Sequence, residues 1–233
     1  MENETFGKLK NLTSKDPLGE RVYRQVKRGI VEGLFPSGEA LPEDQLTKAL
    51  GASRTPVREA LMRLKYDGLV QINPRKGARV LELTPKELDD LLESREVFET
   101  AFFERSVKAI DRKELQKIRE HFNFAEKNLA EAIDNPELWD QKRVEYLNID
   151  FDFHRRLVQA TGNELWISAY STILDKLMVY SHETVLKYPD FFQQAMSEHT
   201  DILNLLLGGD FSEAKWLLRK HITNFKNRLV SSM

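Results

Sequence analysis

The sequence contains no cysteine and no long apolar run. Without thiols, neither a disulfide framework nor a cysteine-based metal site can form, and a reducing cytoplasm suits the chain. No stretch approaches the roughly 18 consecutive apolar residues that a membrane span needs. The acidic start, residues 1–4, precedes no apolar segment of the kind that directs export. We therefore expect a cytoplasmic protein that is neither exported nor bound to a membrane.

Net charge is also small, at −2, but the charges are unevenly distributed. Residues 1–83 hold 15 Lys and Arg against 11 Asp and Glu, whereas residues 84–233 hold 20 against 26. A chain of this length accommodates one small module of about 70–80 residues and one larger domain. We therefore predict two domains, 1–83 and 84–233, of which the basic first domain faces an anionic partner.

The first domain is predicted to begin with three helices. Apolar side chains recur at every fourth position of its first segment, at Leu18, Val22, Val26 and Ile30. This spacing predicts a helix that ends near Gly33. Pro42 opens a short second helix that stops at Gly51, and a longer third helix follows to about Asp67. A short helix, a tight glycine turn and a longer helix are typical of a helix-turn-helix.

A β-hairpin is predicted after the third helix. Two β-prone runs, residues 69–72 and 78–81, are joined by a turn rich in Asn, Pro and Gly. The tip of this hairpin carries Arg75, Lys76 and Gly77. Its positive charge can enter a minor groove or bind a phosphate, as the wing of a winged helix-turn-helix does.

The third helix is the candidate recognition helix, and its first turn holds Arg54, Thr55 and Arg58. Arginine suits a bidentate contact with guanine, and threonine can touch a thymine methyl group or a phosphate. The free backbone N–H groups at the helix start attract an anion. Two alternatives stay open: Ser53 and Thr55 only cap the helix, or the arginines only form a solvated charged face. The agreement of helix-turn-helix, wing and basic helix start favours DNA binding.

These residues also carry a family resemblance. The run from Leu50 to Leu61, LGASRTPVREAL, and the later Gly68-Leu69-Val70 resemble the DNA-binding domain of the GntR family of bacterial regulators over residues 18–83. The resemblance implies operator contacts from Arg54, Arg58, Thr55 and Gly77. Some members have a further DNA-contacting arginine on the second helix, where this sequence has Asp44.

The second domain, residues 84–233, shows helical patterns and almost no strand signal. Helix breaks are predicted near Ile110, Asn135, Gly162, Pro189 and Gly208. They leave about six helices, several of them of the length that bundles use. The predicted fold class is therefore mainly α, with an N-terminal winged helix-turn-helix followed by an antiparallel all-helical bundle of about six helices.

Four residues of the second domain form a candidate metal site: Asp150, His154, His199 and His221. The first two are spaced i, i+4 and therefore share one face of one helix. Three imidazoles and one carboxylate can bind a divalent ion such as Zn, Ni or Mn and leave a position for an oxygen ligand. The alternative is that each histidine is an ordinary hydrogen-bonded or exposed side chain.

The second domain is similar to the FCD effector domain of the FadR subfamily of GntR regulators. The residues that carry this similarity are Asp150, Phe153-His154, Gly162-Asn163, Glu198-His199, Asp210 and His221. The resemblance implies a divalent cation at the base of a ligand cavity, with Arg95 pointing into that cavity. An arginine beside an open metal position suits a small organic acid, and Asn163 is a second candidate effector contact. The alternatives are a surface pair of Arg95 with Glu99 and a helix-capping role for Asn163.

The sequence thus predicts a transcriptional repressor that binds a palindromic DNA operator as a homodimer and responds to a small carboxylate metabolite. We expect no enzyme activity. A metallohydrolase could use the same four ligands with a bound water, but no signal such as His-Glu-x-x-His marks a general base. An architectural DNA binder with a structural metal is the other alternative, and it would show no response to a ligand.

Overall fold

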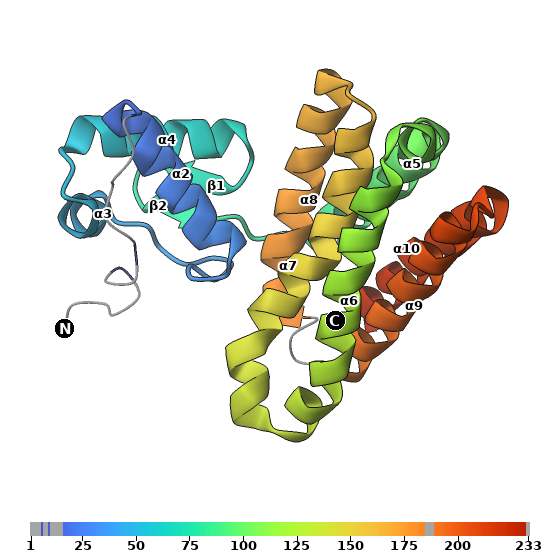
Figure 1. Cartoon of the computed structure of the whole chain (residues 1–233). Coiled ribbons are helices and arrows are strands. Elements are labelled where there is room, and N and C mark those ends of the chain that lie inside the picture. Colours follow the sequence, from blue (N-terminus) through green and yellow to red (C-terminus); the bar gives the residue numbers. More distant parts are fainter. Residues whose placement is uncertain (1–5, 7–8, 10–15, 185–188, 232–233) are drawn as a thin grey trace. The chain divides into compact units, whose positions relative to one another are not determined.

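The computed structural model describes residues 6, 9, 16–184 and 189–231 (Figure 1). Contacts divide these residues into two compact units. One unit comprises the described residues through Leu83 together with Met178–Glu183, and the other comprises Thr84–Leu177 and the described residues from Thr184 onward. Across the described ranges, no helix is long and apolar enough to cross a membrane.

The first unit contains a helix-turn-helix followed by a hairpin. Its elements are α2 (Leu18–Val31), α3 (Glu43–Leu50), α4 (Arg54–Tyr66), β1 (Val70–Asn73) and β2 (Gly77–Val80). Gly51 ends α3 with a φ of 60°, a left-handed conformation that glycine adopts at little cost. The two strands pair antiparallel with Asn73 opposite Gly77, so the turn between them forms the tip of a wing.

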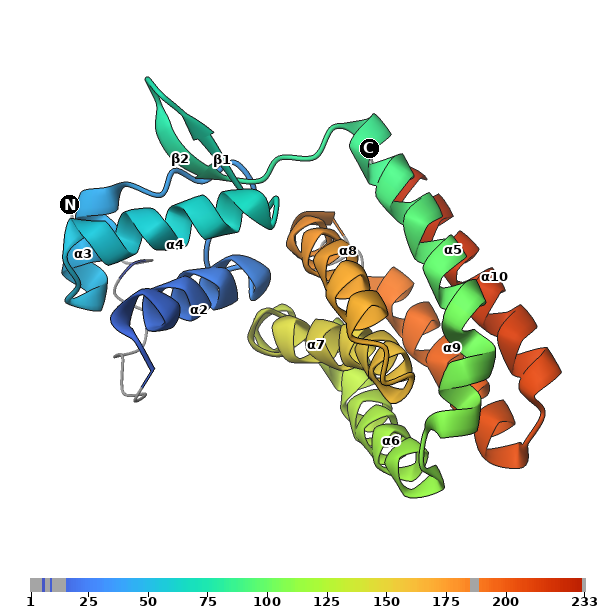
Figure 2. The same cartoon turned by 90° about the horizontal axis from the view of Figure 1, so that it is seen from above.

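The core of the first unit decides which face of α4 points outward. The apolar residues of α4 recur at helical spacing, at Val57, Leu61 and Leu64, and pack in a cluster with Val22 and Val26 of α2. Figure 2 shows α2 and α4 lying along one another. The opposite face of α4 is polar and exposed, and it carries the basic residues of the first helical turn.

The second unit is built from six long helices in the part of the chain that the structure describes. They are α5 (Pro85–Ala109), α6 (Arg112–Asp134), α7 (Pro136–Ala160), α8 (Glu164–Thr184, of which Met178–Glu183 cluster with the first unit), α9 (Pro189–Gly208) and α10 (Phe211–Ser231). The start of α5 is fixed by a capping box, because Thr84 Oγ1 accepts a hydrogen bond from the backbone N–H of Glu87 and the Glu87 carboxylate accepts one from Thr84 N–H.

Packing brings α7, α9 and α10 to a common core. Helix α10 lies beside α5 (Figure 2) and contacts α9, which in turn contacts α6 and α7. Aromatic side chains fill this core, among them Phe102, Phe122, Tyr146, Phe151 and Phe153. The expected fold class, a winged helix-turn-helix with an all-helical bundle, is confirmed.

Candidate nucleic-acid interface and candidate metal centre

The first turn of α4 presents the basic residues that the sequence singles out. The side chains of Arg54 and Arg58 are 67% and 64% exposed, and Thr55 is exposed beside them. Ser53 occupies the N-cap position, but its side chain makes no capping hydrogen bond. The N–H groups at the start of α4 therefore lack the side-chain partner that the capping alternative requires, and this arrangement suits an anion.

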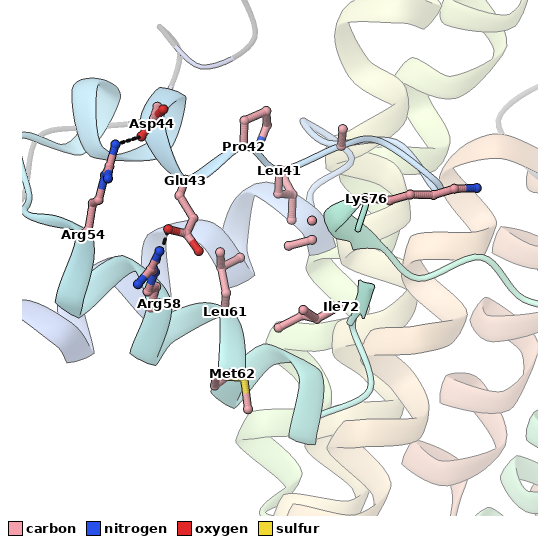
Figure 3. A pocket seen from close by; sticks show the side chains of 13 residues that line it. Leu41, Pro42, Glu43, Asp44, Arg54, Arg58, Leu61, Met62, Ile72 and Lys76 are labelled. Atoms are coloured by element: carbon pink, nitrogen blue, oxygen red, sulfur yellow. Dashed lines mark hydrogen bonds and ion pairs between the residues drawn. The ribbon is translucent and has the colours of Figure 1, made fainter. Parts of the chain in front are cut away.

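The wing and the helix start border one hollow. This hollow measures about 610 Å³ and is lined by Arg54 and Arg58 of α4 and by Lys76 and Gly77 of the wing. Figure 3 shows side chains that line it. The wing tip is exposed, and its turn is closed by a hydrogen bond from Arg75 N–H to the side chain of Asn73. Gly77 has a φ of 78°, which few other residues adopt without strain. Residues of the helix and of the wing that are 18 to 23 positions apart in the sequence thus share one basic concave surface.

Two acidic side chains on α3 also reach this surface. Arg58 Nε donates to Glu43 Oε2 at 2.7 Å, and Arg54 Nη2 donates to Asp44 Oδ1 at 3.0 Å (Figure 3). Sequence reasoning treated Asp44 only as a missing arginine and did not single out Glu43. Both acids lie at the start of the second predicted helix, and a tight turn joins that helix to the recognition helix. This position was the signal in the sequence that could have indicated their contact with the arginines.

The four candidate metal ligands converge inside the second unit. Asp150 and His154 come from α7, His199 from α9 and His221 from α10, and all four are buried. One ligand atom from each lies within 4.8 Å of the others, and the Nε2 atoms of His154 and His199 are 2.9 Å apart. The helix packing thus brings together residues that are as many as 71 positions apart in the sequence.

Hydrogen-bond acceptors outside the quartet orient the three imidazoles. The Nδ1 atom of His154 lies 2.8 Å from Glu99 Oε2, that of His199 lies 2.7 Å from the Ala195 carbonyl, and that of His221 lies 2.6 Å from Glu198 Oε2. Each acceptor draws the ring proton to Nδ1, so the Nε2 lone pair faces the centre. The sequence analysis named Glu99 only as a possible surface partner of Arg95 and Glu198 only within the family resemblance. It gave neither a role at this site, because their histidine partners lie 55 and 23 positions away.

Two buried atoms of the quartet lack a hydrogen bond. Within the described residues, Asp150 Oδ1 and His221 Nε2 are buried without a hydrogen-bond partner. His199 Nδ1 lies 3.2 Å from Asp150 Oδ1, but its proton points to the closer Ala195 carbonyl. A buried acceptor without a hydrogen bond is costly, whereas a cation would satisfy both atoms at once. Ligand atoms at about 2.0–2.2 Å from one ion lie within about 4.4 Å of each other, close to the spread of this quartet. The residues present therefore fit a divalent metal ion.

Burial sets the charge state of these ligands. Burial lowers the pKa of His199 and His221 well below the usual histidine range, and the neighbouring imidazoles act in the same direction. Neutral imidazole is the form that binds a metal. Burial also raises the pKa of Asp150, although the positive charge of Arg95 opposes this effect. A divalent ion beside Asp150 would favour its carboxylate form.

Arg95 lies next to the quartet in a fully buried cluster. Its Nε donates to Glu99 Oε1 at 2.7 Å, and its Nη2 lies 2.7 Å from His154 Nε2. Burial acts to raise the pKa of Glu99, but His154, Arg95 and the hydroxyl of Tyr170 outweigh it, and the pKa lies below its usual range. The pair with Glu99 therefore exists, but it is buried rather than on the surface, and it extends to a candidate metal ligand.

Asn163 has a structural role at the start of α8, and its expected effector contact stays a prediction. Its Oδ1 accepts hydrogen bonds from the backbone N–H groups of Leu165 and Trp166, which lie in the first turn of α8. This is the geometry of an N-cap, and the side-chain oxygen is used by the helix. The capping alternative is therefore the one that the structure favours.

Replacing Asn163 with alanine is expected to lower the free energy of unfolding by about 0.5–2 kcal/mol, because two N–H groups at the start of α8 lose their acceptor. Thermal denaturation should show this loss, while metal content and ligand response stay at their wild-type values. Unchanged stability together with a lost ligand response would instead return Asn163 to the effector site.

Comparisons with known proteins agree with both halves of this description. The family described as "Bacterial regulatory proteins, gntR family" matches residues 18–80, and the family described as "FCD domain" matches residues 90–224. The HTH-type transcriptional regulator YdhC of Bacillus subtilis (strain 168) is 30% identical over 178 residues, which cover 76% of this chain and 79% of that relative. The HTH-type transcriptional repressor RspR of Escherichia coli (strain K12) is 25% identical over 214 residues, covering 91% and 88%.

Solved structures show the same fold. A transcriptional regulator GntR from Rhodococcus sp. RHA1 superposes with a TM-score of 0.77 at 22% identity, covering 92% of this chain and 98% of that one. McbR/YncC of E. coli superposes with a TM-score of 0.76 at 18% identity, covering 93% and 98%. The sequence relatives named above are transcriptional regulators and not enzymes, so the expected absence of enzyme activity is confirmed and the metallohydrolase hypothesis is wrong.

Proposed function

The chain belongs to the GntR family of bacterial transcriptional regulators and carries an FCD domain, and on this basis we propose that it is a metal-dependent repressor controlled by a small organic acid. Residues 1–83 bind DNA in this proposal, and residues 84–233 bind the effector and pair two subunits. The observation that carries the sensing part is the buried quartet of one aspartate and three histidines from three helices.

The DNA-binding part of the proposal rests on the concave surface of the first unit. Arg54, Thr55 and Arg58 occupy the helix turn that enters the major groove, and Arg75, Lys76 and Gly77 form the wing tip that contacts the adjacent backbone. One such surface reads only a few base pairs. Two subunits related by a two-fold axis double the contacts, and a palindromic operator matches that symmetry.

The sensing part of the proposal rests on the donor set. The quartet Asp150, His154, His199 and His221 would hold a divalent ion such as Zn, Ni or Mn. When bound, this ion supplies a Lewis-acidic position for one oxygen of a carboxylate ligand. Glu99 and Glu198 hold two of the imidazoles in the required orientation through their Nδ1 atoms.

Arg95 is the residue that would couple metal and acid. Its Nη2 uses the lone pair of His154 Nε2, and an imidazole nitrogen has only one lone pair. Arg95 and a metal ion therefore compete for His154. A guanidinium displaced from His154 keeps its bond to Glu99 through Nε and offers both terminal nitrogens to a carboxylate, a geometry that arginine favours.

The space beside the quartet also favours a two-state response. The cavity lined by Asp150, Phe192 and Arg228 measures about 10 Å³, which suits a single water molecule. An organic acid is larger than this cavity, so its binding needs side chains or helices to move. A ligand that binds only the rearranged bundle shifts the population toward it, and the chain connection over residues 82–88 would transmit the change to the spacing of the two DNA-binding domains.

Elemental analysis and a thermal-shift screen test this proposal together. Protein purified without chelator or nickel resin is expected to contain about one divalent ion per chain. One or more small carboxylic acids should then raise the melting temperature, because a ligand at 100 times its Kd stabilises the folded state by about 2.7 kcal/mol. Chelation should remove this acid-dependent stabilisation, while an Arg95→Lys variant should keep the ion and lose much of the acid response.

The contrary results are equally clear. Protein without metal after exposure to Zn, Ni and Mn would reduce the quartet to ordinary buried histidines. Bound metal with no response to any acid, and DNA binding that no ligand changes, would favour an architectural DNA binder with a structural ion.

A further inference from the structure

The two arginines of the α4 helix start are held by acids in different ways. Glu43 accepts from Arg58 at Nε, the nitrogen nearest the aliphatic chain, at 2.7 Å. Asp44 accepts from Arg54 at Nη2, one of the two terminal nitrogens, at 3.0 Å. The four residues line the hollow between α3, α4 and the wing, and Figure 3 shows that each ion pair joins α3 to α4. This difference has consequences for base recognition.

An arginine reads guanine by donating two parallel hydrogen bonds to O6 and N7. The terminal nitrogens Nη1 and Nη2 make this contact end-on. A carboxylate at Nε leaves both terminal nitrogens available and fixes the plane of the guanidinium. A carboxylate at Nη2 engages one of the reading nitrogens and places a negative charge where a base edge or phosphate would approach.

The two acids, Glu43 and Asp44, also differ in how exposed they are. The side chain of Glu43 is 36% exposed, and it lies against the hollow that Leu61 and Ile72 also line. The side chain of Asp44 is 75% exposed, so its ion pair is screened by water and easily broken. The contact of Glu43 with Arg58 is the shorter of the two and involves the less exposed acid. An arginine that is already ordered loses less rotamer freedom when it binds DNA.

We propose that Glu43 is a positioning residue for base recognition, which presents the terminal nitrogens of Arg58 to a guanine, whereas Asp44 is a competing anion that Arg54 leaves when DNA binds. The proposal rests on the proposed function, because it assumes that α4 enters the major groove. It assigns opposite effects to two adjacent acids, although charge alone would make both of them repel DNA equally.

The experiment measures sequence discrimination rather than affinity alone. A duplex is first selected from a random library with the wild-type protein, and a scrambled duplex and a duplex with its guanines replaced serve as comparisons. Binding of each duplex is then measured at one fixed salt concentration for wild type, Glu43→Gln and Asp44→Asn. The two variants remove the same charge without changing side-chain volume, so each is the matched control for the other.

For Glu43→Gln, the ratio of selected to scrambled affinity is expected to fall by about 2- to 30-fold, because each half-site loses an exposed charged contact and a dimer has two. Affinity for the scrambled duplex should stay the same or rise. For Asp44→Asn, both affinities should rise and their ratio should stay unchanged. In an Arg54→Ala background, which keeps Arg58, Glu43→Gln should still lower the ratio, whereas in an Arg58→Ala background it should not.

Each other outcome overturns a specific statement. If Glu43→Gln strengthens binding of both duplexes equally, as Asp44→Asn does, Glu43 only repels DNA and the positioning role is wrong, while the proposed function stands. If the wild-type protein selects no sequence at all, the proposed function itself fails. Circular dichroism of both variants checks that the helices are intact.

Discussion

Replacing Arg58 with alanine is expected to abolish sequence-specific DNA binding while the protein stays folded. A bidentate arginine–guanine contact contributes about 1–3 kcal/mol of discrimination against a wrong base, and a dimer makes this contact twice. The affinity for a selected operator should therefore fall by about 30-fold to 10⁴-fold, toward the non-specific level. The side chain is 64% exposed, so its removal leaves the core intact. Electrophoretic mobility shift or fluorescence anisotropy at one salt concentration measures the loss.

The matched control for this prediction is Arg63→Ala on the same helix. Arg63 bonds to Glu20 and lies over the ring of Tyr23, so it faces α2 rather than the hollow. Its loss removes the same charge, but it should change operator affinity only slightly. Equal losses for the two variants would mean that α4 acts through its total charge, and operator binding by the Arg58 variant at wild-type strength would disprove the assignment of α4 as recognition helix.

Replacing His199 with alanine is expected to remove both bound metal and the response to acids, while DNA binding is retained. Loss of an outer hydrogen-bond partner of a metal ligand already costs about 10- to 100-fold in metal affinity, and loss of a ligand should cost more. DNA binding is retained because the reading surface lies in the other compact unit. Elemental analysis, thermal shift with and without chelator, and DNA binding measure the three quantities separately.

Stability alone does not test this second prediction. The ring of His199 packs against Phe122 and Phe153, with centroid distances of 5.1 Å to each, so alanine also removes core packing. The decisive quantity is the effect of a chelator, which should lower the melting temperature of the wild type but not that of the variant. Asp150→Asn removes a ligand charge with little change of volume and should behave in the same way.

The exposed His121 on α6 supplies the control, since His121→Ala should keep metal, acid response and DNA binding. A His199→Ala protein that keeps one ion per chain would remove His199 from the site. If Asp150→Asn, which leaves the core volume nearly unchanged, loses its folded structure together with the ion, the metal is structural rather than regulatory.

Part of the candidate metal centre could be predicted from local spacing. Asp150 and His154 share a face because an α-helix repeats every 3.6 residues, and this holds wherever the helix packs. The contact of Glu99 with His154 could not be predicted this way, because α5 and α7 meet only through tertiary packing. The same limit applies to Arg95, since its i, i+4 spacing to Glu99 is identical for a surface pair and for the buried pair that forms.

The DNA-binding surface shows a similar division. Helix-turn-helix and wing follow from local signals, namely glycine and proline positions and the change from helical to strand periodicity. These local signals did not determine where the side chain of Asn163 points, because an Asn that follows a Gly can equally cap a helix or line a pocket. The ion pairs of Arg54 and Arg58 depend on how α3 crosses α4, and a sequence pattern does not specify that crossing.

The sequence by itself determined the helices, the turn chemistry, the basic helix start and the residue types suited to a metal, because each depends on a few neighbouring residues and on backbone periodicity. Only the tertiary structure decided which of these side chains meet. The packing of α7, α9 and α10 brings His154, His199 and His221 into one buried cluster, and burial then sets the pKa of His199 and His221 and leaves Asp150 Oδ1 without a hydrogen bond. Desolvation and long-range contact arise only when the chain is folded.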